Sequence, residues 1–179
     1  MSSVSPSRYA GSVMAQKAVV RIGWPIIAAV AVVAIAWWLL PWLRGDYATT
    51  PEFRGMTQAR IALINDLGER VELMVRVADE PAEQLAGFQH IGKRVIARSA
   101  ILFAFSHPIR GKFHMRNVVA PLDIAFFAAD GRVLAVMQME PGSELYCPDE
   151  PFQYALETAA GRLERLHISP EGSRLLLDF

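Results

Sequence analysis

The sequence is poor in cysteine and has no surplus of either charge. A single cysteine, Cys147, among 179 residues can form neither an intramolecular disulfide nor a multi-thiolate zinc site. Eighteen Lys and Arg residues balance eighteen Asp and Glu residues, so the formal net charge is zero. A nucleic-acid-binding protein needs extra cations to neutralise phosphates, and we therefore expect no nucleic-acid partner. The 53% content of hydrophobic residues excludes a disordered chain.

Catalytic signatures are also missing. The sequence has no Gly-x-Ser-x-Gly nucleophile elbow and no glycine-rich phosphate loop ahead of a helix. His107 and His114 are separated by seven positions, and no glutamate lies between them at helical spacing, so they do not fit a zinc enzyme. We accordingly predict no metal site and no cofactor. Cys147 is either buried and inert or available for intermolecular chemistry, and because no cysteine or histidine is near it in the sequence, we favour the first alternative.

Charge is absent from one long apolar run, from Ile22 to Leu43. As a helix, these 22 residues would span about 33 Å, and a bilayer core is about 30 Å thick. All four tryptophans lie near the two ends of the run, which is typical of side chains at the headgroup boundary. We therefore expect residues 22–43 to form a transmembrane anchor whose partner is the lipid bilayer.

The flanks of this run predict its orientation. Three basic residues and no acidic residue precede it, whereas basic and acidic residues are balanced just after it. The positive-inside rule makes residues 1–21 a cytoplasmic tail and places the rest of the chain outside the cytoplasm. The alternative is a signal peptide cleaved at Ala34-Ile35-Ala36, which would leave a tryptophan-rich N-terminus. Both alternatives give the domain the same compartment.

The rest of the chain has the pattern of short strands. Residues 44–59 contain Gly, Pro and Thr with little periodicity, and we expect a linker there, followed by a domain over residues 60–179. Apolar runs bounded by turn residues predict seven or eight short strands, with one or two short helices at residues 79–87 and 161–166. This spacing predicts a mainly β domain, either a small sandwich or a barrel. The expected strands cover residues 61–64, 71–77, 100–105, 112–118, 122–129, 132–139, 152–157 and 174–177.

The dipeptide Asp130-Gly131, between two apolar runs, predicts a β-hairpin. A two-residue loop would pair Ala129 with Arg132 and, further from the turn, Asp123 with Gln138. One face of the hairpin is then wholly apolar, and we expect it to face the core. Asp123 lies on the other face, where a buried carboxylate would need partners. The apolar face carries Leu122, Ile124, Phe126, Ala128, Val133, Ala135, Met137 and Met139.

This register decides the interpretation of a methionine-rich motif. Met137 and Met139, with the sequence His114-Met115, could supply soft ligands for copper. The hairpin places both methionines on the apolar face, so we expect them to fill the core instead.

Several short motifs resemble those of a known family. They are Phe113-His114-Met115-Arg116-Asn117, Pro121-Leu122-Asp123-Ile124, Asp130-Gly131-Arg132-Val133 and Tyr154-Ala155-Leu156-Glu157, with the earlier segment Gln84-Leu85-Ala86-Gly87-Phe88. Over residues 71–178 the chain resembles the bacterial domain of unknown function 192. The resemblance implies a compact, mainly β domain that is often exported or anchored, and it implies no established reaction. Its motif positions here are Phe113, Met115, Asn117, Pro121, Asp123, Tyr154, Glu157 and Gly161. Val118 follows Asn117 where relatives usually have threonine.

These observations favour a binding or accessory module on the outer face of a bacterial inner membrane. Asn117, Asp123, Tyr154 and Glu157 would form a polar cluster, with Met115 as a further binding residue, for a small polar ligand or an envelope protein. The alternative is an envelope hydrolase that uses Asp123 or Glu157 as general base, assisted by His114. A purely structural scaffold is a third hypothesis. An open pocket shared by both carboxylates and an unpaired histidine would favour the enzyme, whereas carboxylates occupied by backbone N–H groups or by Arg116 would favour binding.

Overall fold

The computed structural model describes residues 28–35 and 45–176, and these fall into two units that are treated separately. Residues 28–35 are helical. Within the described ranges, no helix is both long enough and apolar enough to cross a membrane. The expected cytoplasmic tail and the remaining parts of the expected anchor, residues 22–27 and 36–43, lie outside the described residues.

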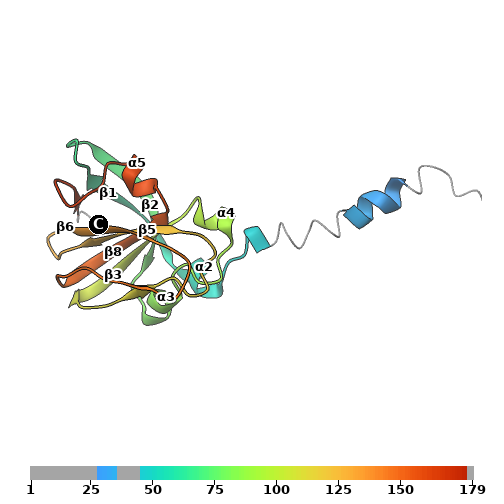
Figure 1. Ribbon diagram of the computed structural model, residues 1–179, viewed down its shortest axis with the longest axis horizontal. Coiled ribbons are helices and arrows are strands. Elements are labelled where there is room, and N and C mark those ends of the chain that lie inside the picture. The colour runs from blue at the N-terminus through green and yellow to red at the C-terminus, as the bar shows by residue number, and fades with distance from the viewer. Residues whose placement is uncertain (1–27, 36–44, 177–179) are drawn as a thin grey trace, which may run out of the picture. The chain divides into compact units, whose positions relative to one another are not determined.

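The larger unit, which we call the body, is built on one curled seven-stranded sheet (Figure 1). Its strand order is β6-β5-β8-β3-β2-β1-β9, in which β2 and β3 are parallel and the other neighbours are antiparallel. The strands are β1 Thr57–Ile64, β2 Arg70–Ala78, β3 Ala100–Ile109, β5 Leu122–Phe127, β6 Val133–Met139, β8 Phe152–Ala159 and β9 Arg174–Leu176, and a separate two-stranded sheet holds β4 Phe113–His114 and β7 Leu145–Tyr146. The predicted mainly β class is confirmed.

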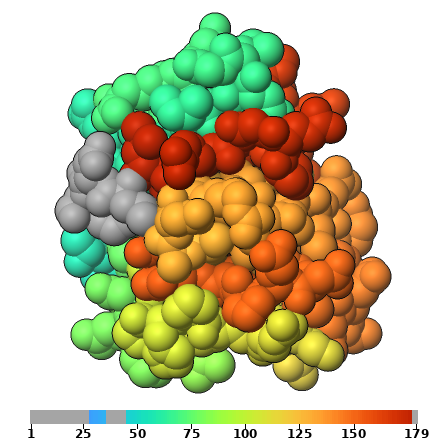
Figure 2. Space-filling model, turned by 90° about the vertical axis from the view of Figure 1, so that its left-hand side faces the viewer, coloured from blue at the N-terminus to red at the C-terminus, as the bar shows by residue number. Residues whose placement is uncertain are grey.

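The two edges of the curled sheet meet at one seam. Arg132, just before β6, forms an antiparallel bridge with Arg174 in β9. Next to it, the N–H of Leu175 donates a hydrogen bond of 2.7 Å to the carbonyl oxygen of Gly131. Figure 2 shows the C-terminal residues, in red, lying between the green N-terminal strands and the orange strands. The sheet is therefore a partly closed barrel rather than a two-sheet sandwich.

Apolar residues are buried on both faces of this sheet. The inner core contains residues from all seven strands, which places it inside the curl, together with Leu163 and Ile168. The outer core lies on the opposite face and includes Phe103, Ile124 and Phe126. Side chains from outside the sheet cover this outer core. They are Phe53, Met56, Phe88, Ile91, Ile96, Met115 and Val118.

Four short helices are described in the body: α2 Pro51–Gly55, α3 Pro81–Ala86, α4 Lys93–Ile96 and α5 Arg162–Arg165. The two expected helices correspond to α3 and α5. The helix α4 was not expected, and it contributes the buried Ile96 to the outer core.

The expected linker ends earlier than predicted, because α2 and the start of β1 belong to the body. Phe53 and Met56 are only 1% and 2% exposed. The Arg76 guanidinium donates to the Phe53 carbonyl oxygen at 3.0 Å, and its central carbon lies 4.5 Å from the centre of the Phe53 ring. Two buried apolar residues in a short segment are too few to produce a hydrophobic periodicity, so the sequence pattern did not predict that they are buried.

The expected hairpin register is confirmed for five pairs, from Leu122 opposite Met139 to Phe126 opposite Ala135. The register then shifts, and Phe127 lies opposite Val133, so that Leu134 is an extra residue. The loop is also longer than expected, because Ala128 and Arg132 are hydrogen-bonded and Gly131 donates to the Ala128 carbonyl oxygen at 3.0 Å. All six residues of β5 are buried, so both faces of the hairpin contact a core. Met139 is fully buried and Met137 packs against the outer core, as expected.

Candidate functional site

Glu157 occupies a central position in the sheet. It lies in β8 opposite Ile101 of β3 on one side and Ile124 of β5 on the other. Because side chains alternate along a strand, Glu157 shares the outer face with Ala155, a member of the outer core. Its side chain is only 5% exposed. Its carboxyl has no hydrogen bond or ion pair with any residue that the structure describes.

This environment changes the protonation of Glu157. Burial raises the pKa of its carboxyl to about 8, because surroundings of low polarity disfavour the charged form. The carboxyl is therefore mainly protonated at neutral pH. In that form it offers one O–H donor as well as acceptor oxygens.

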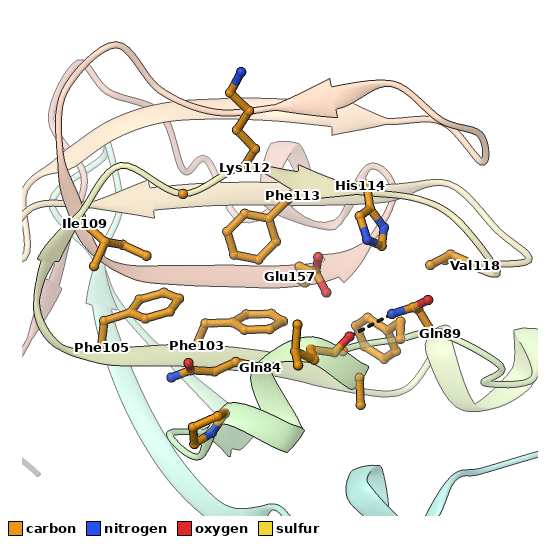
Figure 3. A pocket seen from close by; sticks show the side chains of 16 residues that line it. Gln84, Gln89, Phe103, Phe105, Ile109, Lys112, Phe113, His114, Val118 and Glu157 are labelled. Atoms are coloured by element: carbon orange, nitrogen blue, oxygen red, sulfur yellow. Dashed lines mark hydrogen bonds between the residues drawn. The ribbon is translucent and has the colours of Figure 1, made fainter.

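The Glu157 carboxyl faces a pocket of about 430 Å³ on the outer face of the sheet (Figure 3). We call it the Glu157 pocket. Its residues come from α3 and the loop after it, from β3, from β4 with the loops on either side of it, and from β8. Four aromatic rings line it, and two of them, Phe103 and Phe113, pack edge to face at 5.0 Å. A mostly apolar concave surface with few polar groups is typical of a small-molecule site. The lining aromatic residues are Phe88, Phe103, Phe105 and Phe113.

His114 lines the same pocket from β4. Its Nδ1 atom is buried and has no hydrogen-bond partner among the described residues. Figure 3 shows its ring directed, like the Glu157 carboxyl, into the space between β4 and α3. The pocket therefore contains a buried ring nitrogen and a carboxyl that have no hydrogen-bond partner among the described residues.

Gln84 and Lys112 are further polar residues of the lining. The Gln84 side-chain nitrogen donates to the carbonyl oxygens of Ala78 at 3.4 Å and of Ala104 at 3.1 Å. Carbonyl oxygens accept hydrogen bonds only from donors, so the group that faces them must be the NH2 of the Gln84 amide. The Gln84 side-chain oxygen therefore remains available as an acceptor. Lys112 extends away from the aromatic rings in Figure 3.

Gly87 brings the end of α3 close to the carboxyl. It follows the helix with φ of +46°, a conformation that side chains rarely adopt. A Cβ atom at this position would lie 3.7 Å from Oε2 of Glu157 and 3.4 Å from Cζ of Phe103. The glycine therefore keeps one wall of the pocket free of a methyl group beside the carboxyl.

Asp123 lies on the other side of the sheet. It precedes Ile124, the partner of Glu157, so its side chain projects toward the inner core. The backbone N–H of Leu163 in α5 donates to Oδ2 of Asp123 at 3.0 Å, and Asp123 is 5% exposed. The two carboxylates therefore share no pocket. Asp123 accepts a hydrogen bond from the start of α5. Glu157 shares its pocket with His114, whose Nδ1 has no partner among the described residues.

The remaining expected site residues are also divided between the faces. Tyr154 is half-buried against the inner core, on the face opposite Glu157. Met115 is buried in the outer core. Asn117 donates from Nδ2 to Oε1 of Gln89 at 3.2 Å, and Gln89 lines the pocket. Asn117, Asp123, Tyr154 and Glu157 therefore do not form one polar cluster, which corrects the expectation.

The other candidate chemistry lies elsewhere. Cys147 is exposed and not buried as expected. His107 is exposed, and its Nδ1 is 3.1 Å from the Ser106 hydroxyl. Across residues 28–35 and 45–176, no group of three or more His, Cys, Asp and Glu residues is arranged to hold a metal ion.

Sequence reasoning identified Glu157 and His114 but missed the rest of the pocket. Gln84 and Gly87 belong to the segment Gln84–Phe88, which carried part of the family resemblance. Phe88 ends the same segment and Phe113 is a motif position of the resemblance. Phe103 and Phe105 gave no sequence signal, because phenylalanines at strand spacing are equally typical of an ordinary core.

Comparisons with known proteins agree with this fold. A crystal structure of a putative transcription regulator from Sinorhizobium meliloti is 28% identical, with a TM-score of 0.62, and the match covers 68% of this chain and 94% of that one. A crystal structure of a protein of unknown function from Novosphingobium aromaticivorans is 26% identical, with a TM-score of 0.61, covering 74% and 96% of the two chains. No curated protein matches the chain significantly. The family DUF192, described as "Uncharacterized ACR", matches residues 63–176, and the chain belongs to this family.

Proposed function

We propose that the body binds a small molecule in the Glu157 pocket. The observation that carries this proposal is Glu157, a residue only 5% exposed, whose carboxyl has no partner among the described residues and faces a pocket of about 430 Å³. An unsatisfied buried polar group costs about 1–3 kcal/mol, and a ligand that forms a hydrogen bond to it would recover part of this free energy. The aromatic walls would receive an apolar part of the same ligand.

The location of this binding module is a second part of the proposal. Residues 22–43 would anchor it in a bacterial inner membrane, with the body on the outer side as an accessory module of the envelope. A reporter enzyme fused to the C-terminus should then be active only outside the cytoplasm. Activity restricted to the cytoplasm would overturn this topology.

An enzymatic role has one specific observation in its favour, the raised pKa of Glu157 beside an unpaired histidine. At neutral pH such a carboxyl would act as a general acid, whereas the sequence suggested a general base. Among the described lining residues there is no Ser, Thr, Cys or Tyr that could serve as a nucleophile. We therefore favour binding over hydrolysis. Chemical turnover of a retained compound by the wild-type chain would reverse this preference.

The S. meliloti protein is titled a putative transcription regulator. Residues 60–179 of this chain contain thirteen Lys and Arg residues against sixteen Asp and Glu residues. An acidic body is poorly suited to phosphate contacts, which supports a small-molecule ligand over a nucleic acid.

The test is recovery of the bound compound. The full chain would be purified from its native membranes in mild detergent, and the material released on denaturation would be identified by mass spectrometry. We expect one compound to be retained by the wild-type chain and lost from Glu157→Leu, which removes the carboxyl. Glu171→Gln, which changes an exposed carboxyl, is the matched control. Identical material from all three chains, or none from any, would overturn the proposal and favour a structural scaffold.

A further inference from the structure

We propose that the ligand of the Glu157 pocket carries an ammonium cation that contacts the Glu157 carboxyl among the phenylalanine rings. This inference rests on the proposed function and specifies the chemical class of its ligand. It follows from the hydrogen-bonding groups that the pocket leaves unused, from its aromatic walls and from the placement of the charged side chains.

The side-chain amide donors of the lining are mostly engaged. The Gln84 side-chain nitrogen donates to the carbonyl oxygens of Ala78 and Ala104, at 3.4 and 3.1 Å. The Gln89 side-chain nitrogen donates to the carbonyl oxygen of Leu85 at 2.7 Å. The pocket therefore has few side-chain N–H groups left to offer a ligand.

Oε1 of Gln89 accepts from Asn117, but three other side-chain acceptors of the lining are unused among the described residues. The two oxygens of Glu157 have no partner among the described residues. Nδ1 of His114 is buried without a partner, and it accepts a hydrogen bond when the ring proton is on Nε2. The Gln84 oxygen is a third acceptor. A ligand with several N–H donors matches this surplus, and an ammonium group offers three.

The walls suit a positive charge as well. Phe103, Phe105 and Phe113 line the pocket, and the face of an aromatic ring attracts a cation that lies within about 6 Å of its centre. A cation would also supply the counter-charge that an ionised Glu157 lacks. On binding, the Glu157 carboxyl would transfer its proton to the buffer, and the ammonium group would remain charged. One proton is therefore released for each ligand bound at neutral pH.

An anionic ligand would find no comparable site. Glu157, His114 and Lys112 are the titratable residues among the described lining, and α3 contributes none. Lys112 extends away from the rings (Figure 3), so it does not direct its ammonium group at the cavity. The protonated Glu157 carboxyl would offer a carboxylate ligand one O–H donor, but no cationic side chain of the described lining would neutralise the ligand's charge.

Three probes of similar shape and different charge test this inference. They are 2-phenylethylamine, 2-phenylethanol and phenylacetate, titrated by calorimetry into the full chain in detergent at neutral pH. We expect the amine to bind at least tenfold more tightly than either other probe. Repeating the titration in buffers of different ionisation enthalpy should show release of about one proton per bound amine. Glu157→Gln should lose both the preference and the proton release, whereas Glu171→Gln should keep both.

Equal or tighter binding of the alcohol or of phenylacetate would overturn the cation assignment and leave the binding function in place. Absence of binding by all three probes would also overturn it. The binding function itself would fail only if, in addition, no compound were recovered from the native membranes. The same result in Glu157→Gln as in the wild-type chain would show that the amine does not depend on the Glu157 carboxyl, and this too contradicts the inference.

Discussion

Asp123 and Glu157 lie on adjacent strands of the sheet but on opposite faces of it. Because Ile124 is the register partner of Glu157, the residue before it projects to the inner side while Glu157 projects to the outer side. Each residue is 5% exposed, yet only Asp123 accepts a hydrogen bond from the described residues. Two acidic residues that look equivalent in the sequence therefore differ: Asp123 is hydrogen-bonded to a helix, whereas the carboxyl of Glu157 has no partner among the described residues.

The first prediction concerns pH. The pKa of Glu157 is raised from 4.5 to about 8 on folding, so between these values the folded chain binds one proton more than the unfolded chain. The free energy of unfolding should then fall as pH rises, by about 1.4 kcal/mol per pH unit from this residue alone. The stabilisation is fully present below pH 4.5 and is lost as pH rises through 8.

Urea unfolding at about pH 5.5 and about pH 7.5 measures this dependence. Glu157→Gln cannot titrate and should lose this contribution to the slope, while Glu171→Gln should retain it. Equal slopes in the wild-type chain and Glu157→Gln would contradict the assignment of a neutral, buried carboxyl.

The second prediction concerns Asp123. Replacement by alanine leaves the Leu163 N–H without its acceptor, and we expect the free energy of unfolding to fall by about 1–3 kcal/mol. Asp123→Asn keeps an acceptor oxygen and should cost less. Thermal and urea unfolding of the two variants measure the difference. No loss in Asp123→Ala would show that this hydrogen bond does not hold α5.

The third prediction concerns the seam of the sheet. Gly131→Ala would place a Cβ atom in steric overlap with the Leu175 carbonyl oxygen, on a backbone with φ of +84°. Gly68 has a similar φ of +77° but nothing within 4 Å of its Cβ position. Gly68→Ala therefore reports the conformational strain alone, about 1–2 kcal/mol. We expect Gly131→Ala to cost more than this control in urea unfolding, and equal costs would contradict the close approach at the seam.

The fourth prediction concerns the segment that sequence analysis assigned to a linker. Phe53→Ala should lower the free energy of unfolding by about 3–5 kcal/mol, because the ring is buried in the outer core. Leu67→Ala is the control, since Leu67 is 63% exposed. If Phe53→Ala lowered the free energy of unfolding as little as the control, this segment would be a linker and not part of the body.

The register of the β5–β6 hairpin was predictable from the sequence, whereas the strand order and the pocket were not. The Asp-Gly dipeptide and the alternation around it predicted Asp123 opposite Gln138, because hairpin register depends on local pattern. The bulge beside Phe127 was not predictable, since the extra residue depends on how β6 bends to reach the seam. Local alternation also could not show that β8 lies between β3 and β5, and this order is what buries Glu157. The pocket required tertiary contacts from α3 and β4, which no single segment encodes.

The seam has a consequence for the timing of folding. β9 is the last described strand of the chain, and it pairs with β1 while it bridges to the start of β6. The two edges of the curled sheet can therefore meet only after β9 has left the ribosome, or the translocation channel if the body is exported. Until then β1 and the start of β6 present open edges, which invite pairing with other chains. A nascent or truncated form that lacks β9 should for this reason be the one that depends on chaperones.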